Sequence, residues 1–261
     1  WSSQAAPTLV CVYRSDVTLE RMLDTNPVEA LKETKLAGYE LFQIDMSDGF
    51  KLEAALVKPV NFDASKKYPV WFTTYAGPHA PTIQDSWGGG HTHDQALANE
   101  GFIVFKTDPR SASGKGAVSA WAAYKKLGVS EMKDIEEAIA WLCTQPFVDA
   151  ERIGMSGYSY GGFMTAYAMT HSKRFKCGIA GGTVSDWALY DSIYTERFMD
   201  TPQNNPTGYA ETSVITAASN VHGKLLLVHG TLDDNVHMQN TIKLVDALVK
   251  ADKDFELQLY P

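Results

Sequence analysis

A serine stands between two glycines in the run Gly-Tyr-Ser-Tyr-Gly at residues 157–161. This is the G-x-S-x-G pattern of a nucleophile elbow, a sharp strand-to-helix turn that exposes the hydroxyl at its apex. Small flanking residues let the two elements approach closely, and the N–H groups at the helix start suit a developing oxyanion. Ser159 is therefore the candidate nucleophile. The alternative is a glycine-rich structural turn with an idle serine.

A serine nucleophile needs a base that takes its proton and an acid that orients the base. In α/β-hydrolases the order along the chain is serine, acid, histidine, and the acid follows a later strand. The apolar run 225–228 predicts such a strand, and Asp233 or Asp234 on the loop after it is the candidate acid. Either aspartate could instead cap the helix that follows.

The histidine that this order requires is not found among the 261 residues. The chain has seven histidines, at positions 79, 91, 93, 171, 222, 229 and 237. His237 follows the acid too closely to reach its far side, and no histidine follows the last predicted helix and strand. The triad is therefore expected to be incomplete here, with its histidine beyond Pro261.

Two further clusters have residue types that could do chemistry. His91 and His93 could bind a metal, but no third ligand has a recognisable spacing, so neither a metal nor another cofactor is expected. Trp187, Tyr190 and Tyr194 recur at helical spacing. They could form the core of a helix or the wall of an apolar substrate pocket.

The elements that must position these residues are predicted from apolar patterns. Strand-like runs lie at 7–14, 39–46, 50–58, 69–75, 102–105, 152–155, 175–180, 225–228 and 255–260. Helices are predicted near 94–99, from a cap at Ser130 to Leu142, after the elbow, and over 241–250. Asp48-Gly49 predicts a tight hairpin. Short buried strands that alternate with helices predict the α/β class, with a mostly parallel sheet and helices on both faces.

Composition excludes several classes of function. The net charge is −8 and no basic block occurs, so nucleic acid is not an expected partner. No apolar run reaches the length of a membrane span, and no signal peptide opens the chain. The three cysteines, at 11, 143 and 177, lack a metal-binding spacing and are expected to be small buried apolar residues.

Two segments are expected along the chain. Residues 1–25 are interpreted as the tail of a preceding domain with a linker, and 26–261 as an α/β domain that ends before its catalytic histidine. Trp1 is not a natural start, so the chain is expected to be cut from a longer protein.

Several long motifs occur in order: 157–162, 187–199 and 229–237, with shorter ones at 75–78 and 175–180. With them the chain resembles the catalytic domain of the dipeptidyl-peptidase-IV-like serine peptidases, which belong to the prolyl oligopeptidase family. The resemblance covers most of residues 40–261 and implies an α/β-hydrolase fold whose C-terminal part is missing. One departure is that Arg110 is followed by Ser111, where the family usually has glycine.

The resemblance implies a role for each matching residue. Ser159 would be the nucleophile and Asp233 the acid, while the Tyr75 hydroxyl and the Tyr160 N–H would form the oxyanion hole. Asn235 would bind the carbonyl of the residue before the proline or alanine. The small apolar pocket for that proline or alanine would be lined by Tyr160, Val184, Trp187, Tyr190, Tyr194 and Val236.

The implied activity is that of an exopeptidase. It would release N-terminal dipeptides after a penultimate proline or alanine, through an acyl-enzyme. The family's β-propeller would precede residue 1, and the full protein would be a secreted or periplasmic homodimer. The alternatives are an acylaminoacyl peptidase or oligopeptidase of the same family, or a catalytically dead binding or scaffold domain.

Overall fold

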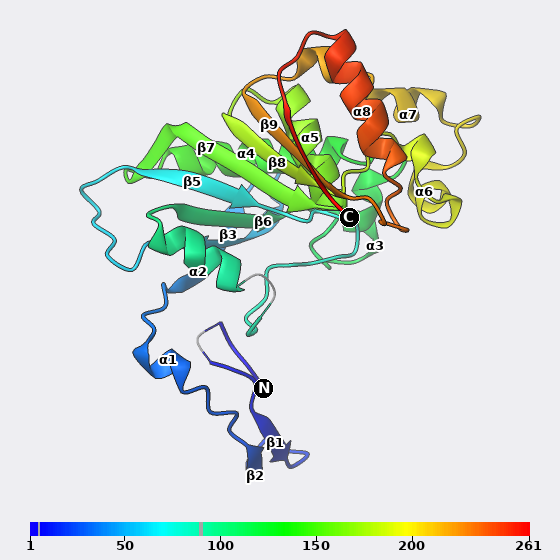
Figure 1. Ribbon diagram of the computed structural model, residues 1–261. Helices are drawn as coiled ribbons and strands as arrows, with labels where there is room; N and C mark the ends of the chain where they lie inside the picture. The colour runs from blue at the N-terminus through cyan, green and yellow to red at the C-terminus, as the bar shows by residue number, and fades with distance from the viewer. Residues whose placement is uncertain (5, 89–90) are drawn as a thin grey trace.

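A computed structural model describes the chain except for residues 5, 89 and 90 (Figure 1). Its centre is an eight-stranded sheet of order β10-β9-β8-β7-β5-β6-β4-β3. The strands are β3 (Tyr39–Asp45), β4 (Lys51–Val57), β5 (Tyr68–Thr73), β6 (Ile103–Asp108), β7 (Val148–Tyr158), β8 (Cys177–Gly181), β9 (Lys224–Gly230) and β10 (Glu256–Tyr260). Strand β4 pairs antiparallel with β3 and β6, and all other neighbours are parallel. The predicted mostly parallel sheet is confirmed.

Helices lie against both faces of this sheet, but unequally (Figure 1). They are α2 (His91–Asn99), α3 (Ala117–Ala120), α4 (Val129–Cys143), α5 (Tyr160–His171), α6 (Ser192–Met199), α7 (Pro206–Thr212) and α8 (Gln239–Lys250), with short 3₁₀ turns η1 (Trp121–Ala123), η2 (Trp187–Leu189) and η3 (Ala218–Asn220). Buried side chains of α4, α5 and α8 share one large core with Phe72 and Phe105 of the sheet. On the other face, Ala98 of α2 packs on Val57 and Val104.

Helix α5 is the most deeply buried of these helices. Tyr160 and the ten residues that follow it, through Thr170, are all buried. A helix that is apolar all round belongs inside a domain rather than on its surface. It starts directly after β7, in the middle of the sheet, so the residue between them is held by a central strand and a buried helix.

The N-terminal segment forms a separate small sheet. Strands β1 (Val10–Tyr13) and β2 (Leu19–Asp24) pair antiparallel, and helix α1 (Ala30–Glu33) leads from them to β3. The sequence predicted the first strand but not the second, because every side chain of β2 is exposed and leaves no apolar alternation to read. Figure 1 shows this hairpin apart from the main sheet. The boundary after residue 25 stays a prediction.

Two turns show how local sequence shapes the domain. The hairpin at Asp48-Gly49 is confirmed, and Gly49 has a φ of 82°. The prediction that Ser130 caps α4 is wrong. The helix begins at Val129 after Gly128, whose φ is 95°, and Glu131 accepts the Gly128 N–H at 3.1 Å. A carboxylate inside the first turn therefore caps this helix.

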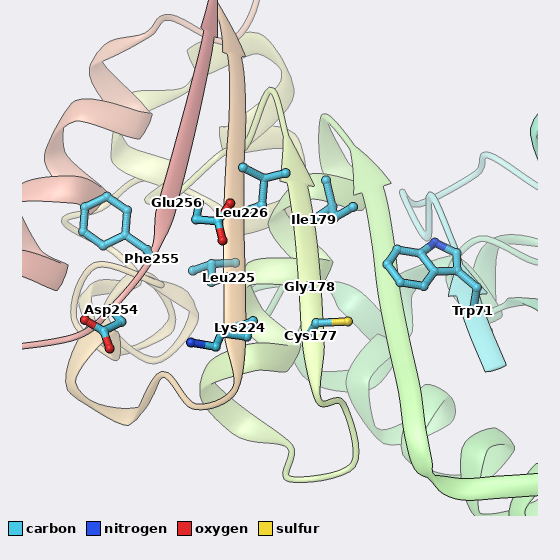
Figure 2. Close-up of a pocket in the computed structure, with 10 residues that line it drawn as sticks. All are labelled: Trp71, Cys177, Gly178, Ile179, Lys224, Leu225, Leu226, Asp254, Phe255 and Glu256. Atoms are coloured by element: carbon cyan, nitrogen blue, oxygen red, sulfur yellow. The ribbon is translucent and has the colours of Figure 1, made fainter. Parts of the chain in front are cut away.

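A pocket of about 240 Å³ lies across β5, β8, β9 and β10 (Figure 2). Its lining includes Trp71 and the first residues of two strands, Cys177 and Lys224. Ligands of open parallel sheets bind at the carboxyl ends of the strands, and this pocket lies toward their amino ends. Cys177 is a free thiol, as are Cys11 and Cys143, and all three are partly buried. None of the described helices is long and apolar enough to cross a membrane.

Candidate functional site

Ser159 lies at the junction of β7 and α5, the strand-turn-helix arrangement that the motif requires. Its φ of 59° and ψ of −116° are strained for a residue with a side chain. The Ser159 N–H donates to the Gly181 carbonyl on β8 at 2.9 Å, and its own carbonyl accepts the Phe163 N–H. The Ser159 hydroxyl makes no capping bond to α5. The backbone of this serine is thus held on both sides, while its hydroxyl is not used to cap the helix.

The glycines of the motif are required by close backbone contacts. A Cβ at Gly157 would lie 2.4 Å from the Gly161 carbonyl oxygen, and one at Gly161 would lie 2.4 Å from the Thr74 carbonyl oxygen. At Gly162 it would lie 2.2 Å from the Gly181 oxygen. Only glycine permits α5 to begin this close to the ends of β5 and β8.

Asp233 lies on the loop after β9 and shares a pocket of about 270 Å³ with Ser159. One carboxylate oxygen accepts the N–H groups of Asn235 and Val236, at 3.1 and 2.9 Å. The other oxygen lies 3.5 Å from the Tyr158 hydroxyl. The neighbouring Asp234 is exposed. The geometry therefore places Asp233, of the two candidate acids, beside the serine.

His229 is the histidine nearest to Asp233 among the described contacts, with its Nε2 3.6 Å from the carboxylate. It is fully buried, and its Nε2 also lies 2.8 Å from the Val236 carbonyl, which only accepts hydrogen bonds. The Nε2 therefore carries the proton, and Nδ1 accepts from the Thr241 hydroxyl at 2.6 Å. Because both ring nitrogens are engaged away from solvent, His229 stiffens the acid loop and is not placed to act as a base.

The aromatic residues singled out in the sequence converge on one cage. Trp187 is buried, with its ring centroid 5.4 Å from that of Tyr160 and 6.1 Å from those of Tyr190 and Tyr194. The Tyr190 hydroxyl donates to the Asn235 side chain at 2.8 Å, which ties the cage to the acid loop. Val184 and Val236, the other two predicted pocket residues, are both buried. Burial raises the pKa of Tyr194 and of Tyr190, so both phenols stay protonated.

The spacing of these aromatic residues does not reflect a single helix. Trp187 lies on the 3₁₀ turn η2, Tyr190 follows that turn, and Tyr194 lies on α6. Asp186 accepts the Ala188 N–H and Asp191 accepts the Tyr194 N–H, so each short element has its own cap. The interpretation of Trp187, Tyr190 and Tyr194 as the core of one helix is therefore wrong.

Tyr75 follows β5 and packs against the elbow. Its side chain is 37% exposed, and its ring lies 6.1 Å from that of Tyr160, the first residue of α5. A Cβ on Gly161 would lie 3.3 Å from the Tyr75 Cα, so the two backbones touch. The next residue, Ala76, has a φ of 64°. The strained turn sends the chain away from the elbow and leaves the Tyr75 ring beside it.

Two groups near the site had no signal in the apolar pattern. Tyr158, the second residue of the motif, is 60% exposed and lines the pocket of Ser159. Glu131 is fully buried, and the Tyr160 hydroxyl donates to it at 3.0 Å. A glutamate three residues after a glycine at a helix start is the available sequence signal for a capping role.

The possible metal site at residues 91–94 is not assembled from the described groups. The side chain of His91 lies outside the described part of the chain, and that of His93 is exposed. Asp94 is buried, and its carboxylate accepts from Tyr39 and, at 2.9 Å, from Lys106. Within the described residues, no group of three or more His, Cys, Asp or Glu side chains is placed to hold a metal ion.

Comparisons of the sequence and of the structure with known proteins find the same group of peptidases. A sequence model of the prolyl oligopeptidase family matches residues 91–261. The venom dipeptidyl peptidase 4 of Vespula vulgaris is 41% identical over 220 residues, which are 82% of this chain and 28% of that protein. The chain spans about a quarter of the length of the curated relatives that it matches.

Two solved structures are similar to this chain over its whole length. The crystal structure of Porphyromonas gingivalis dipeptidyl peptidase 4 is similar with a TM-score of 0.93 and 39% identity, covering 100% of this chain and 37% of that one. A Bacteroides ovatus structure is similar with a TM-score of 0.94 and 35% identity, again over 100% of this chain and 37% of that one. The predicted α/β-hydrolase fold is confirmed by these likenesses.

Proposed function

This chain belongs to the prolyl oligopeptidase family, and we propose that it is the hydrolase domain of a serine exopeptidase of the dipeptidyl peptidase type. The observation that carries the proposal is the strained Ser159, which shares a pocket with the anchored carboxylate of Asp233. Strain of this kind persists where the surrounding structure over-determines it, and it concentrates at functional sites.

The proposed reaction is acyl transfer through a serine ester. The Ser159 Oγ attacks the carbonyl carbon of the second substrate residue, and its proton passes to a histidine that Asp233 orients. The histidine returns this proton to the leaving amine as the C–N bond breaks, which leaves the dipeptide esterified to Ser159. A water molecule then gives its proton to the histidine and attacks the ester, and the Ser159 oxygen departs with that proton.

We place this histidine after Pro261. None of the described histidines other than His229 approaches Asp233, and His229 has both nitrogens engaged. Pro261 itself lines the pocket of Ser159 and Asp233, which supports this placement. The chain spans only about a quarter of the length of its curated relatives. We also propose that a propeller domain precedes it.

The developing oxyanion is proposed to bind between the Tyr75 hydroxyl and the N–H of Tyr160. Tyr160 is the first residue of α5. The first N–H groups of a helix lack intrahelical partners, and with the helix dipole they stabilise a negative charge at this end. The Tyr75 ring lies beside Tyr160, which supports a second donor from that side.

Specificity for proline or alanine is proposed to come from the aromatic cage. Flat rings from Tyr160, Trp187 and Tyr194 pack on one another and leave a small apolar wall. Asn235, held by the Tyr190 hydroxyl, would present its amide to the preceding carbonyl. Substrates would be peptides with proline or alanine at the second position. A homodimer and a secreted or periplasmic location are also proposed, and the Vespula vulgaris relative is named as a venom protein.

The test uses a fluorophosphonate probe and peptide substrates on the complete protein that carries this chain. Wild type should be labelled at Ser159 and should cleave Gly-Pro-p-nitroanilide, while Ser159→Ala should lose both and keep its melting temperature. A matched control is Ser65→Ala, in an exposed loop. Cleavage only of amino-terminally blocked substrates would favour an acylaminoacyl peptidase or an oligopeptidase. Absence of labelling in wild type would favour a scaffold domain.

A further inference from the structure

Glu131 is a fully buried carboxylate that accepts four hydrogen bonds from the described residues, all of them from neutral donors. One oxygen accepts from the hydroxyls of Ser111, at 2.9 Å, and Tyr160, at 3.0 Å. The other accepts the Gly128 N–H at 3.1 Å and the Ser130 hydroxyl at 2.9 Å. Burial raises the pKa of this carboxyl, while these bonds act in the opposite direction. A buried acid without a cation is costly to retain, so its position calls for an explanation.

The four donors come from three segments. Ser111 lies on the loop after β6, Gly128 and Ser130 lie at the start of α4, the helix of Glu131 itself, and Tyr160 is the first residue of α5. The bond to Tyr160 is the one that reaches the candidate site. Tyr160 directly follows Ser159, and its ring faces Trp187 at 5.4 Å and Phe163 at 5.4 Å.

Tyr160 has two proposed parts in the reaction, one from its backbone and one from its ring. Its phenol is fully buried, and its pKa is raised well above the ordinary value by burial and by the adjacent Glu131, so it is a permanent donor. A side chain with a locked hydroxyl cannot rotate, and it holds the ring that faces the substrate pocket in one orientation.

We propose that Glu131 is a positioning residue that fixes Tyr160, and thereby sets the shape of the pocket for proline. This inference rests on the proposed function. The pocket wall that meets a pyrrolidine ring is then held in place from behind by a carboxylate on another helix. Loss of that carboxylate lets the Tyr160 ring shift, and proline loses more contact than alanine because its side chain reaches further.

The readout is the ratio of kcat/KM for Gly-Pro-p-nitroanilide to that for Gly-Ala-p-nitroanilide, measured on the complete protein. Both values come from one preparation, so the ratio does not depend on the fraction of enzyme that is folded. Glu131→Leu, which removes the acceptor of the Tyr160 hydroxyl, and Tyr160→Phe should each lower it by about tenfold, the scale of a methylene-sized mismatch in an apolar pocket. The double variant should lower it no further than either single one, because both remove the same contact.

Asp108→Leu is the matched control. Asp108 is also a buried carboxylate, whose hydrogen bonds within the described part of the chain come from the neutral donors of Thr82 and Ile83, and it does not touch the cage. This variant should lower the melting temperature and leave the ratio unchanged. An unchanged ratio in either single variant, or additive effects in the double variant, would overturn the inference. If wild type cleaves neither substrate, the proposed function fails, and this inference fails with it.

Discussion

The nucleophile candidate Ser159 could be identified from the sequence, but the distant hydrogen bonds that support the site could not. The motif 157–161 located the serine, and the loop after 225–228 narrowed the acid to two neighbours. The hydrogen bonds that hold Asp233 come from Asn235 and Val236, two and three residues away, so a local pattern can anticipate them. The partners of Glu131 come from Ser111 and Tyr160, which are distant in sequence, and apolar periodicity does not register a buried acid.

The Tyr75 hydroxyl provides a prediction at this scale. Tyr75→Phe should lower kcat about 10²–10³-fold, as expected for the loss of one oxyanion donor, with a smaller effect on KM. Steady-state kinetics on the complete protein measure this. Tyr13→Phe, on the separate hairpin of β1 and β2, is the control for loss of a tyrosine hydroxyl and should leave kcat unchanged. Unchanged turnover in Tyr75→Phe would remove Tyr75 from the proposed oxyanion hole.

At the scale of elements, the parallel core was predictable and the short connecting elements were not. Strands buried on both faces give continuous apolar runs, and the hairpin at Asp48-Gly49 has a turn signal of its own. The segment 187–199 breaks into a 3₁₀ turn and a helix, each capped by its own aspartate. Because such breaks depend on local capping bonds, a periodicity of three to four residues cannot reveal them.

Helix α5 supplies the prediction for this scale. Gly162→Ala should lower the melting temperature and abolish labelling of Ser159, because the added Cβ would lie 2.2 Å from the Gly181 oxygen and 2.9 Å from the Thr183 hydroxyl. The cost of such overpacking is typically about 1–3 kcal/mol. Gly38→Ala is the control, since no atom of the described residues lies within 4 Å of its added Cβ. Thermal unfolding followed by circular dichroism gives the comparison, and equal melting temperatures would contradict this packing.

At the scale of the whole molecule, His171 and His222 couple stability to pH. Burial lowers the pKa of His171 and of His222 below the ordinary value of 6.5. As the pH falls through 6.5, the unfolded chain takes up protons that the folded chain does not, so the free energy of unfolding decreases. The His171 ring stacks on that of Tyr167 at 3.8 Å, while Lys173 further disfavours a charge on His222.

The double variant His171→Gln/His222→Gln should therefore lose less stability than wild type between pH 7 and pH 5. Its absolute stability should be lower, because the stacking on Tyr167 is lost. Urea unfolding at several pH values measures the slope. His237→Gln is the control for the loss of a histidine from an exposed position. A slope for the double variant equal to that of wild type would exclude these two histidines as its source.

The order of strands also bears on how the site comes into being during folding. Ser159 follows β7 and Asp233 follows β9, and β8 lies between these two strands in the sheet. The Ser159 N–H bonds to Gly181 at the end of β8, and the Gly182 N–H bonds to Val228 on β9. The two residues are therefore brought together by non-local strand pairing, the kind that closes long loops and slows folding. An early collapsed chain would contain both residues without yet bringing them together, so the site forms only once β8 and β9 have joined β7 in the sheet.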